Sequence, residues 1–125
     1  MYIVIMSYKL HNYLPRLIEK ELGYSLEHNP VTAVVGPRQS GKSTLVRHML
    51  RHRKNTVMLD LELPSDQRKL QDAEFFFREH QRKLICIDEI QMRPDLFPVL
   101  RAMVDLERRP GRFLILGSAS RDLIR

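Results

Sequence analysis

The sequence predicts an α/β fold in which one parallel β-sheet is flanked by helices. Four short runs are rich in Val, Ile and Leu without polar alternation, at residues 31–35, 56–59, 84–87 and 113–116. Strands that are buried on both faces of a parallel sheet have this composition. Helix-length segments separate the runs, so strand and helix alternate, and right-handed crossovers are the simplest connections between the strands.

An amphipathic helix is predicted before the first of these runs. Residues 13–22 place four aliphatic side chains at helical spacing: Leu14, Leu17, Ile18 and Leu22. Pro15 is tolerated in a first turn and Gly23 is a common stop signal, so we expect the helix to end there. Residues 1–30 are taken as an N-terminal segment containing this helix, and residues 31–125 as the core domain.

Three later helices are predicted between the strands. Each carries apolar side chains on one face, at residues 43–52, 72–80 and 95–106. Within the second of these, Phe75, Phe76 and Phe77 are expected to pack in the core rather than to bind a ligand. The chain contains neither an internal repeat nor a Gly/Ser linker, so these elements are expected to form one unit.

Composition and charge agree with one globular domain that binds an anion. Of the 125 residues, 43% are hydrophobic and 29% are charged, which suits a domain with a single core rather than a disordered tail. Lys and Arg outnumber Asp and Glu by 21 to 15, so the net charge is +6. That balance favours polyanions such as nucleotides or nucleic acid, without choosing between them.

The chain has the features of a cytoplasmic protein without a membrane partner. Its first six residues are apolar but too few to span a membrane, and they lack the basic start and cleavage site of a signal peptide. The single cysteine, Cys86, lies in an apolar run, so there is no disulfide framework and no cysteine metal site. Such cysteine usage fits a reducing compartment.

A glycine-containing loop between the first run and the next helix matches the Walker A pattern at every fixed position. The match consists of Gly36, Pro37, Arg38, Gln39, Ser40, Gly41, Lys42 and Ser43, with Thr44 following. Its glycines let the backbone approach phosphates, while successive N–H groups and the helix N-terminus attract the anion. Lys42 is expected to reach the β- and γ-phosphates of ATP, and the Ser43 hydroxyl to ligate Mg²⁺. A chance turn is disfavoured because strand, spacing and helix all agree.

Two carboxylates at the end of the third run form a Walker B pattern. Residues 84–87 are apolar and deliver Asp88 to the carboxyl end of the strand, where ligands bind in open α/β sheets. We expect Asp88 to hold Mg²⁺, and Glu89 to orient and deprotonate the attacking water. The alternative is a strand that simply ends in solvated acids.

The fourth run ends in Gly117 and Ser118, which places a small polar side chain at the tip of another strand. We expect Ser118 to hydrogen-bond the γ-phosphate or the attacking water, with Ser120 as a less favoured substitute. An ordinary Gly-Ser turn remains the alternative.

Together these residues resemble AAA-type ATPases of bacteria and archaea that carry GPRQxGK[ST], DEIQ and TGS boxes, usually followed by a C-terminal domain of unknown function. The matching segments are residues 36–44, residues 88–91 with Pro94 after them, and residues 116–118, where Leu116 replaces the usual Thr. The resemblance covers residues 31–125. It implies an additional-strand P-loop fold with strand order 5-1-4-3-2, ATP and Mg²⁺ as ligands, and a role for Gln91 in reporting nucleotide state.

Other functions are weaker. A GTPase needs a guanine-reading motif that the chain lacks, and a P-loop kinase does not need Glu89 beside Asp88. A nucleotide-regulated DNA-binding module without significant turnover remains the alternative. The basic stretch at residues 47–54 is interpreted as a solvated face, since no stacking aromatics interleave with it, and contact with nucleic acid is the alternative. His48 and His52 lack a third ligand for a metal.

The resemblance also predicts an incomplete sheet. Only polar or helix-like residues follow Leu116, so we expect the last strand to be missing and the edge of the Walker A strand to be open. On this view the chain is an N-terminal portion of a longer protein. It would act with a C-terminal domain or a partner chain, and by itself would self-associate and hydrolyse ATP poorly. The sequence assigns no arginine finger, and Arg121 and Arg125 are candidates only because they are basic and close to the last predicted strand.

Overall fold

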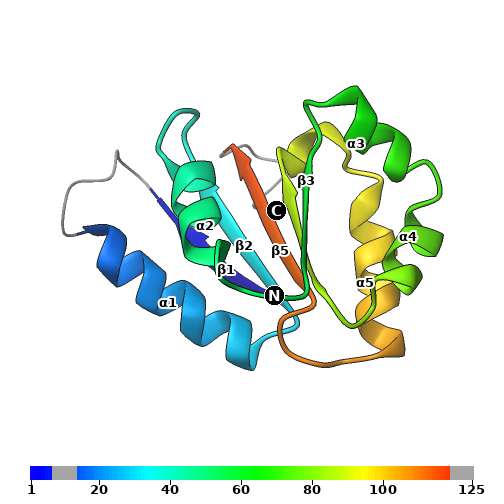
Figure 1. Ribbon diagram of the computed structural model, residues 1–125, viewed down its shortest axis with the longest axis horizontal. Coiled ribbons are helices and arrows are strands. Elements are labelled where there is room, and N and C mark those ends of the chain that lie inside the picture. The colour runs from blue at the N-terminus through cyan, green and yellow to red at the C-terminus, as the bar shows by residue number, and fades with distance from the viewer. Residues whose placement is uncertain (7–13, 119–125) are drawn as a thin grey trace.

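The computed structural model describes residues 1–6 and 14–118, which form one five-stranded sheet with helices on both faces (Figure 1). The strands run parallel in the order β1-β2-β5-β4-β3. Their bounds are β1 Tyr2–Ile5, β2 Val31–Gly36, β3 Thr56–Asp60, β4 Leu84–Asp88 and β5 Phe113–Ser118. The predicted α/β class and the four predicted strands are confirmed, each strand being one or two residues longer than its apolar run.

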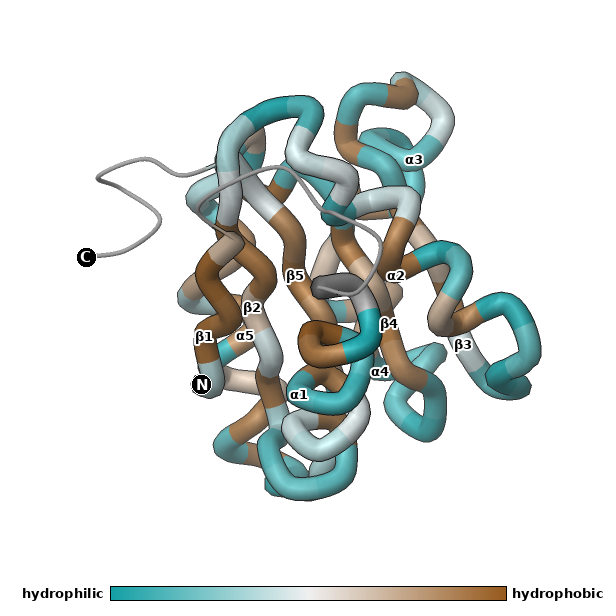
Figure 2. The backbone as a smooth tube through the Cα atoms, turned by 90° about the vertical axis from the view of Figure 1, so that its left-hand side faces the viewer, coloured by the Kyte–Doolittle hydropathy of each residue, from teal (hydrophilic) through white to brown (hydrophobic). Residues whose placement is uncertain are grey.

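The helices divide between the two faces of the sheet. One face is covered by α1 (Leu14–His28) and α2 (Lys42–Leu50), and the other by α4 (Ala73–Glu79) and α5 (Leu96–Leu106). A short helix, α3 (Pro64–Lys69), and a 3₁₀ turn, η1 (Ile90–Met92), complete the described elements. Figure 2 shows the apolar stretches along the strands and the polar residues in the connecting loops. None of the described helices is long and apolar enough to span a membrane.

The first strand corrects the expectation of an open edge. β1 pairs with β2 from Tyr2 opposite Thr32 to Ile5 opposite Val35, and the N–H of Met6 continues the ladder to the carbonyl of Val35 at 2.7 Å. The sheet therefore has its fifth strand at the edge that the prediction left open. The prediction expected this strand after Leu116 and held residues 1–8 only as the replacement, although the apolar, β-branched opening of the chain is long enough for an edge strand. The open edge was the reason for expecting self-association, so that expectation no longer has a structural basis.

The first helix is longer than predicted. α1 passes Gly23, which has no positive φ, and ends at His28. The added turns are held to the sheet because Leu26 is buried and the hydroxyls of Ser25 and Thr32 lie 2.6 Å apart in the core. Tertiary packing thus outweighs the weak stop signal of one glycine.

The three consecutive phenylalanines have different environments. Phe77 is fully buried and packs edge to face on Phe113, with 5.1 Å between ring centroids, and Phe76 is partly buried against the same core. Phe75 is 59% exposed, so its predicted core position is wrong. A helix of seven residues cannot turn three successive side chains toward one face.

Candidate functional site

The predicted Walker A loop leaves the carboxyl end of β2 and enters α2 at the upper edge of the sheet in Figure 1. A Cβ on Gly36 would lie 2.7 Å from the carbonyl oxygen of Met6, so only glycine allows β1 to pack there. Gly41 precedes α2 with a φ of 90°, and Gln39 also has a positive φ of 61°. Gly36 is thus required by the close approach of Met6, and Gly41 by its positive φ.

Lys42 is buried beneath this loop. Its side chain is 4% exposed, and Nζ donates one hydrogen bond, to the carbonyl of Pro37 at 3.1 Å. An ammonium group has three donors, and no salt bridge to Lys42 occurs within the described residues. The Ser40 hydroxyl is also buried without a hydrogen-bond partner. The loop therefore holds donor groups that suit an anion.

Ser43 and Asp88 meet although 45 residues separate them in sequence. The Ser43 hydroxyl donates to Oδ2 of Asp88 at 2.7 Å, and the N–H of Glu89 donates to the other carboxylate oxygen at 2.9 Å. Asp88 is 7% exposed, at the carboxyl end of β4. Hydroxyl and carboxylate oxygens are the ligand types that Mg²⁺ prefers.

The described residues contain no group of three His, Cys, Asp or Glu side chains that could hold a metal ion. A Mg²⁺ ion would therefore take oxygens from Ser43 and Asp88 together with those of a bound phosphate and water, which is its usual mode with nucleotides. His48 and His52 are exposed, and both ring systems lie against the guanidinium of Arg51. A cation in that position disfavours a metal there.

Glu89 and Ser118 are connected through Gln91. The Gln91 amide nitrogen donates to Oε2 of Glu89, and its oxygen accepts the backbone N–H of Ser118 at 3.2 Å. Glu89 has a positive φ of 61°, and the Ser118 hydroxyl is buried without a partner among the described residues. The structure thus brings together the three predicted residues at the ends of β4 and β5. Ser120, Arg121 and Arg125 lie outside the described residues.

A polar pocket of about 390 Å³ opens over these groups, lined by residues 38–44 with Glu62 and Glu89. Sequence reasoning missed Glu62, which follows the carboxyl end of β3 and forms an exposed ion pair with Arg38 at 3.6 Å. The strand-end rule that found Asp88 applies equally to β3 and was the available signal. Arg38 therefore faces a neighbouring element. Thr44 is an exposed residue of the pocket lining, and Pro37 is exposed outside that lining.

A family model described as an AAA domain matches residues 28–125. The chain belongs to this AAA domain family. Membership makes it a P-loop protein of the nucleotide-binding, ATPase-like kind. The match starts at the end of α1, so it includes all the strands except β1.

Two curated proteins are similar to this chain. They are the uncharacterized proteins Mb2031c of Mycobacterium bovis and Rv2008c of Mycobacterium tuberculosis, each 46% identical over 100 residues. The aligned region covers 80% of this chain but 22% of either relative, so the chain spans about a fifth of their length. No solved structure matches the chain significantly.

Proposed function

We propose that the chain binds ATP at the loop between β2 and α2 and hydrolyses it with Mg²⁺. The observation that carries this proposal is the hydrogen bond between Ser43 and Asp88, 2.7 Å long, directly beneath the loop. A hydroxyl and a carboxylate from two distant segments are held where a Walker A serine and a Walker B aspartate act together.

The phosphates would be held by the backbone of the loop and by Lys42. Because Lys42 is buried with a single neutral partner, a nucleotide would supply the negative charge that its ammonium lacks. The unpartnered Ser40 hydroxyl supports a bound acceptor at the same place. Mg²⁺ held by Ser43 and Asp88 would neutralise charge on the β- and γ-phosphates.

Glu89 is the proposed base for the attacking water. Glu89 lines the pocket, whereas the carboxylate of the adjacent Asp88 accepts a hydrogen bond from Ser43. We therefore assign the two carboxylates different roles. A phosphotransferase would not need a second carboxylate at this position, which favours water as the acceptor. Ser118, with its buried free hydroxyl, is proposed to contact the γ-phosphate or this water.

The energy of hydrolysis would be used by an attached domain or a partner chain. The two relatives are several times longer than the region that aligns, which supports a role as one module of a larger protein. We propose a cytoplasmic location, where ATP and Mg²⁺ are abundant.

Calorimetric titration with ATP tests the proposal, with and without Mg²⁺. Ser43→Ala should weaken binding in the presence of Mg²⁺ by about tenfold or more and have little effect in EDTA, because the lost group acts through the metal. Ser65→Ala, at an exposed serine of α3, is the matched control. Equal affinities of wild type and Ser43→Ala in Mg²⁺ would count against the metal site.

A further inference from the structure

The amino ends of the strands form a second surface, opposite the nucleotide site. Three loops lie side by side there: residues 51–55 precede β3, residues 81–83 precede β4 and residues 107–112 precede β5. Hydrogen bonds join them: the guanidinium of Arg109 donates to the carbonyls of Gln81 and Lys83, and the N–H of Leu84 donates to the carbonyl of Asn55 at 2.9 Å. The three loops therefore form one continuous surface.

This surface carries a concentration of positive charge. We call it the basic rim and define it by seven residues: Arg51, Arg53, Lys54, Arg82, Lys83, Arg108 and Arg109. Residues 51–55, 81–83 and 107–109 contain these seven basic residues and one acidic residue, Glu107, so their net charge of +6 equals that of the whole chain. Outside these three segments the chain has 14 basic and 14 acidic residues, Arg112 being one of the basic ones.

The charges of the rim are not neutralised within the described residues. The described residues form four salt bridges, made by Arg38, Lys69, Arg78 and Arg93, and none of them includes a residue of the rim. Arg112 belongs to the same loop but is buried, and it donates to the carbonyl of Glu107 at the end of α5. It has a structural partner, whereas most rim side chains reach solvent. Unpaired like charges this close repel one another unless a polyanion binds.

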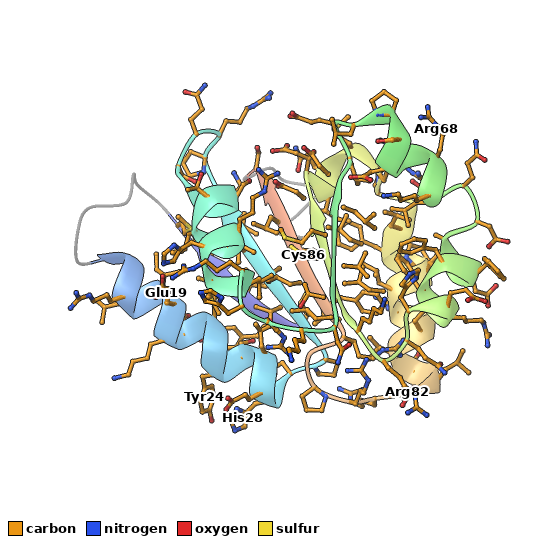
Figure 3. All side chains as sticks on the ribbon, viewed as in Figure 1. Glu19, Tyr24, His28, Arg68, Arg82 and Cys86 are labelled. Atoms are coloured by element: carbon orange, nitrogen blue, oxygen red, sulfur yellow. The ribbon has the colours of Figure 1, made fainter. Side chains whose placement is uncertain are left out.

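An exposed aromatic stack lies beside the rim. The rings of Tyr24 and His28, at the end of α1, are stacked with 4.0 Å between centroids, and Tyr24 is 63% exposed. The N–H of Gly111 donates to the carbonyl of Asn29, which connects this end of α1 to a loop of the rim. Figure 3 shows Tyr24, His28 and Arg82 along the same edge of the molecule. Folding thus supplies the aromatic group that the basic stretch lacks in sequence.

We propose that the basic rim, with Tyr24 and His28, binds single-stranded nucleic acid. A phosphate backbone would lie along the unpaired cations, and an unpaired base would stack on the Tyr24 ring, the combination that serves proteins that bind single strands. An anionic membrane is less suitable, because firm attachment needs inserted apolar side chains and residues 51–55, 81–83 and 107–109 contain none. The surface lies about 17–20 Å from the nucleotide pocket, which is the length of a strand. Binding of nucleic acid there needs no ATP hydrolysis.

Fluorescence anisotropy with a labelled single-stranded 20-nucleotide DNA, read over a salt series, tests the proposal. Combining Arg53→Ala, Arg82→Ala and Arg108→Ala should weaken binding at least tenfold and lower the slope of log affinity against log salt by about 2. The control combines Arg16→Ala, Lys20→Ala and Arg68→Ala, which removes the same charge at exposed sites outside the rim, and should stay within about twofold. Far-UV circular dichroism verifies that both triple variants fold. If the rim triple variant does not fold, the three single rim variants are measured instead, and each should lower the slope by about 0.7.

Two further variants locate the contact. Tyr24→Ala should weaken binding of the single strand by about fivefold or more and leave a matched duplex unaffected, while Tyr24→Phe should retain the affinity, since the ring provides the stack. Lys42→Ala should leave DNA binding unchanged, which separates the rim from the phosphate loop. Equal losses in the two triple variants, loss of DNA binding in Lys42→Ala, or binding to phosphatidylserine vesicles but not to DNA would each overturn the proposal.

Discussion

Gln91 hydrogen-bonds Glu89 through its amide nitrogen while its amide oxygen accepts the backbone N–H of Ser118. One side chain therefore connects the carboxylate that follows β4 with the tip of β5, where the Ser118 hydroxyl is buried without a partner among the described residues. Any movement of either strand end changes the position of Glu89. This connection is the structural basis for a role of Gln91 in positioning the proposed base.

Gln91→Ala should lower the turnover of ATP by about tenfold, because an unsupported Glu89 samples unproductive orientations. The dissociation constant for Mg-ATP should change little, since Gln91 does not line the phosphate loop. Steady-state kinetics together with calorimetry separates the two effects. Gln71→Ala, at an exposed glutamine, is the control, and unchanged turnover in Gln91→Ala would remove the positioning role.

Glu89→Gln should preserve ATP binding but lower hydrolysis by about 10² or more, the scale of a lost general base. The amide keeps the size of the side chain and removes its ability to accept the proton of water. Phosphate release measured at saturating ATP gives the comparison. Normal turnover in this variant would show that another group activates the water.

Lys42→Ala should abolish tight binding of Mg-ATP. The substitution removes the buried cation that is proposed to face the β- and γ-phosphates and leaves the backbone donors of the loop in place. Isothermal titration calorimetry is the direct measurement, with Lys20→Ala as a control for loss of one positive charge. An unaltered affinity for ATP would exclude this loop as the phosphate site.

Val4→Asp should destabilise the chain by about 3 kcal/mol or more, because it buries a carboxylate without a partner between β1 and α1. The adjacent Ile5 is 68% exposed, so Ile5→Asp should cost less than about 1 kcal/mol. Urea unfolding of both variants tests whether β1 is an integral strand of the sheet. Equal costs at the two positions would mean that β1 does not pair with β2 in solution.

The stability of α3 should depend on pH through Asp66. Burial raises the pKa of this carboxyl, but hydrogen bonds from the N–H of Asp60 and from Lys69 outweigh burial and hold the pKa below its usual value of 3.8. The stabilisation is therefore complete above the pKa of the unfolded chain and is lost as the pH falls through the lower pKa of the folded state.

Asp66→Asn should accordingly cost about 1.5–3 kcal/mol at neutral pH and less at a pH well below 3.8, where protonation of the wild-type carboxyl removes the charge that the variant lacks. Urea unfolding at the two pH values measures the difference. Asp105→Asn, at an exposed aspartate of α5, is the control at neutral pH. A cost that stays constant between the two pH values would contradict the proposed ionisation.

The sequence by itself determined the four strands β2 to β5, most of the helices and the loop between β2 and α2, because apolar runs, helical periodicity and glycine positions are local signals. It also identified Ser43, Asp88, Glu89 and Ser118 as strand-end and loop residues. Only the tertiary structure decided which of them touch, since the contact of Ser43 with Asp88 depends on the strand order that places β5 between β2 and β4.

Tertiary structure also decided the features that no local pattern encodes. β1 became the edge strand because β2 offered unpaired backbone groups and α1 an apolar surface for Val4, and α1 passed Gly23 because Leu26 and Ser25 gained buried partners. The basic rim exists because parallel strands bring the loops before them to one edge, so charges dispersed along the sequence are collected there. Long-range pairing and burial, which no window of neighbouring residues contains, are the physical reason for each of these outcomes.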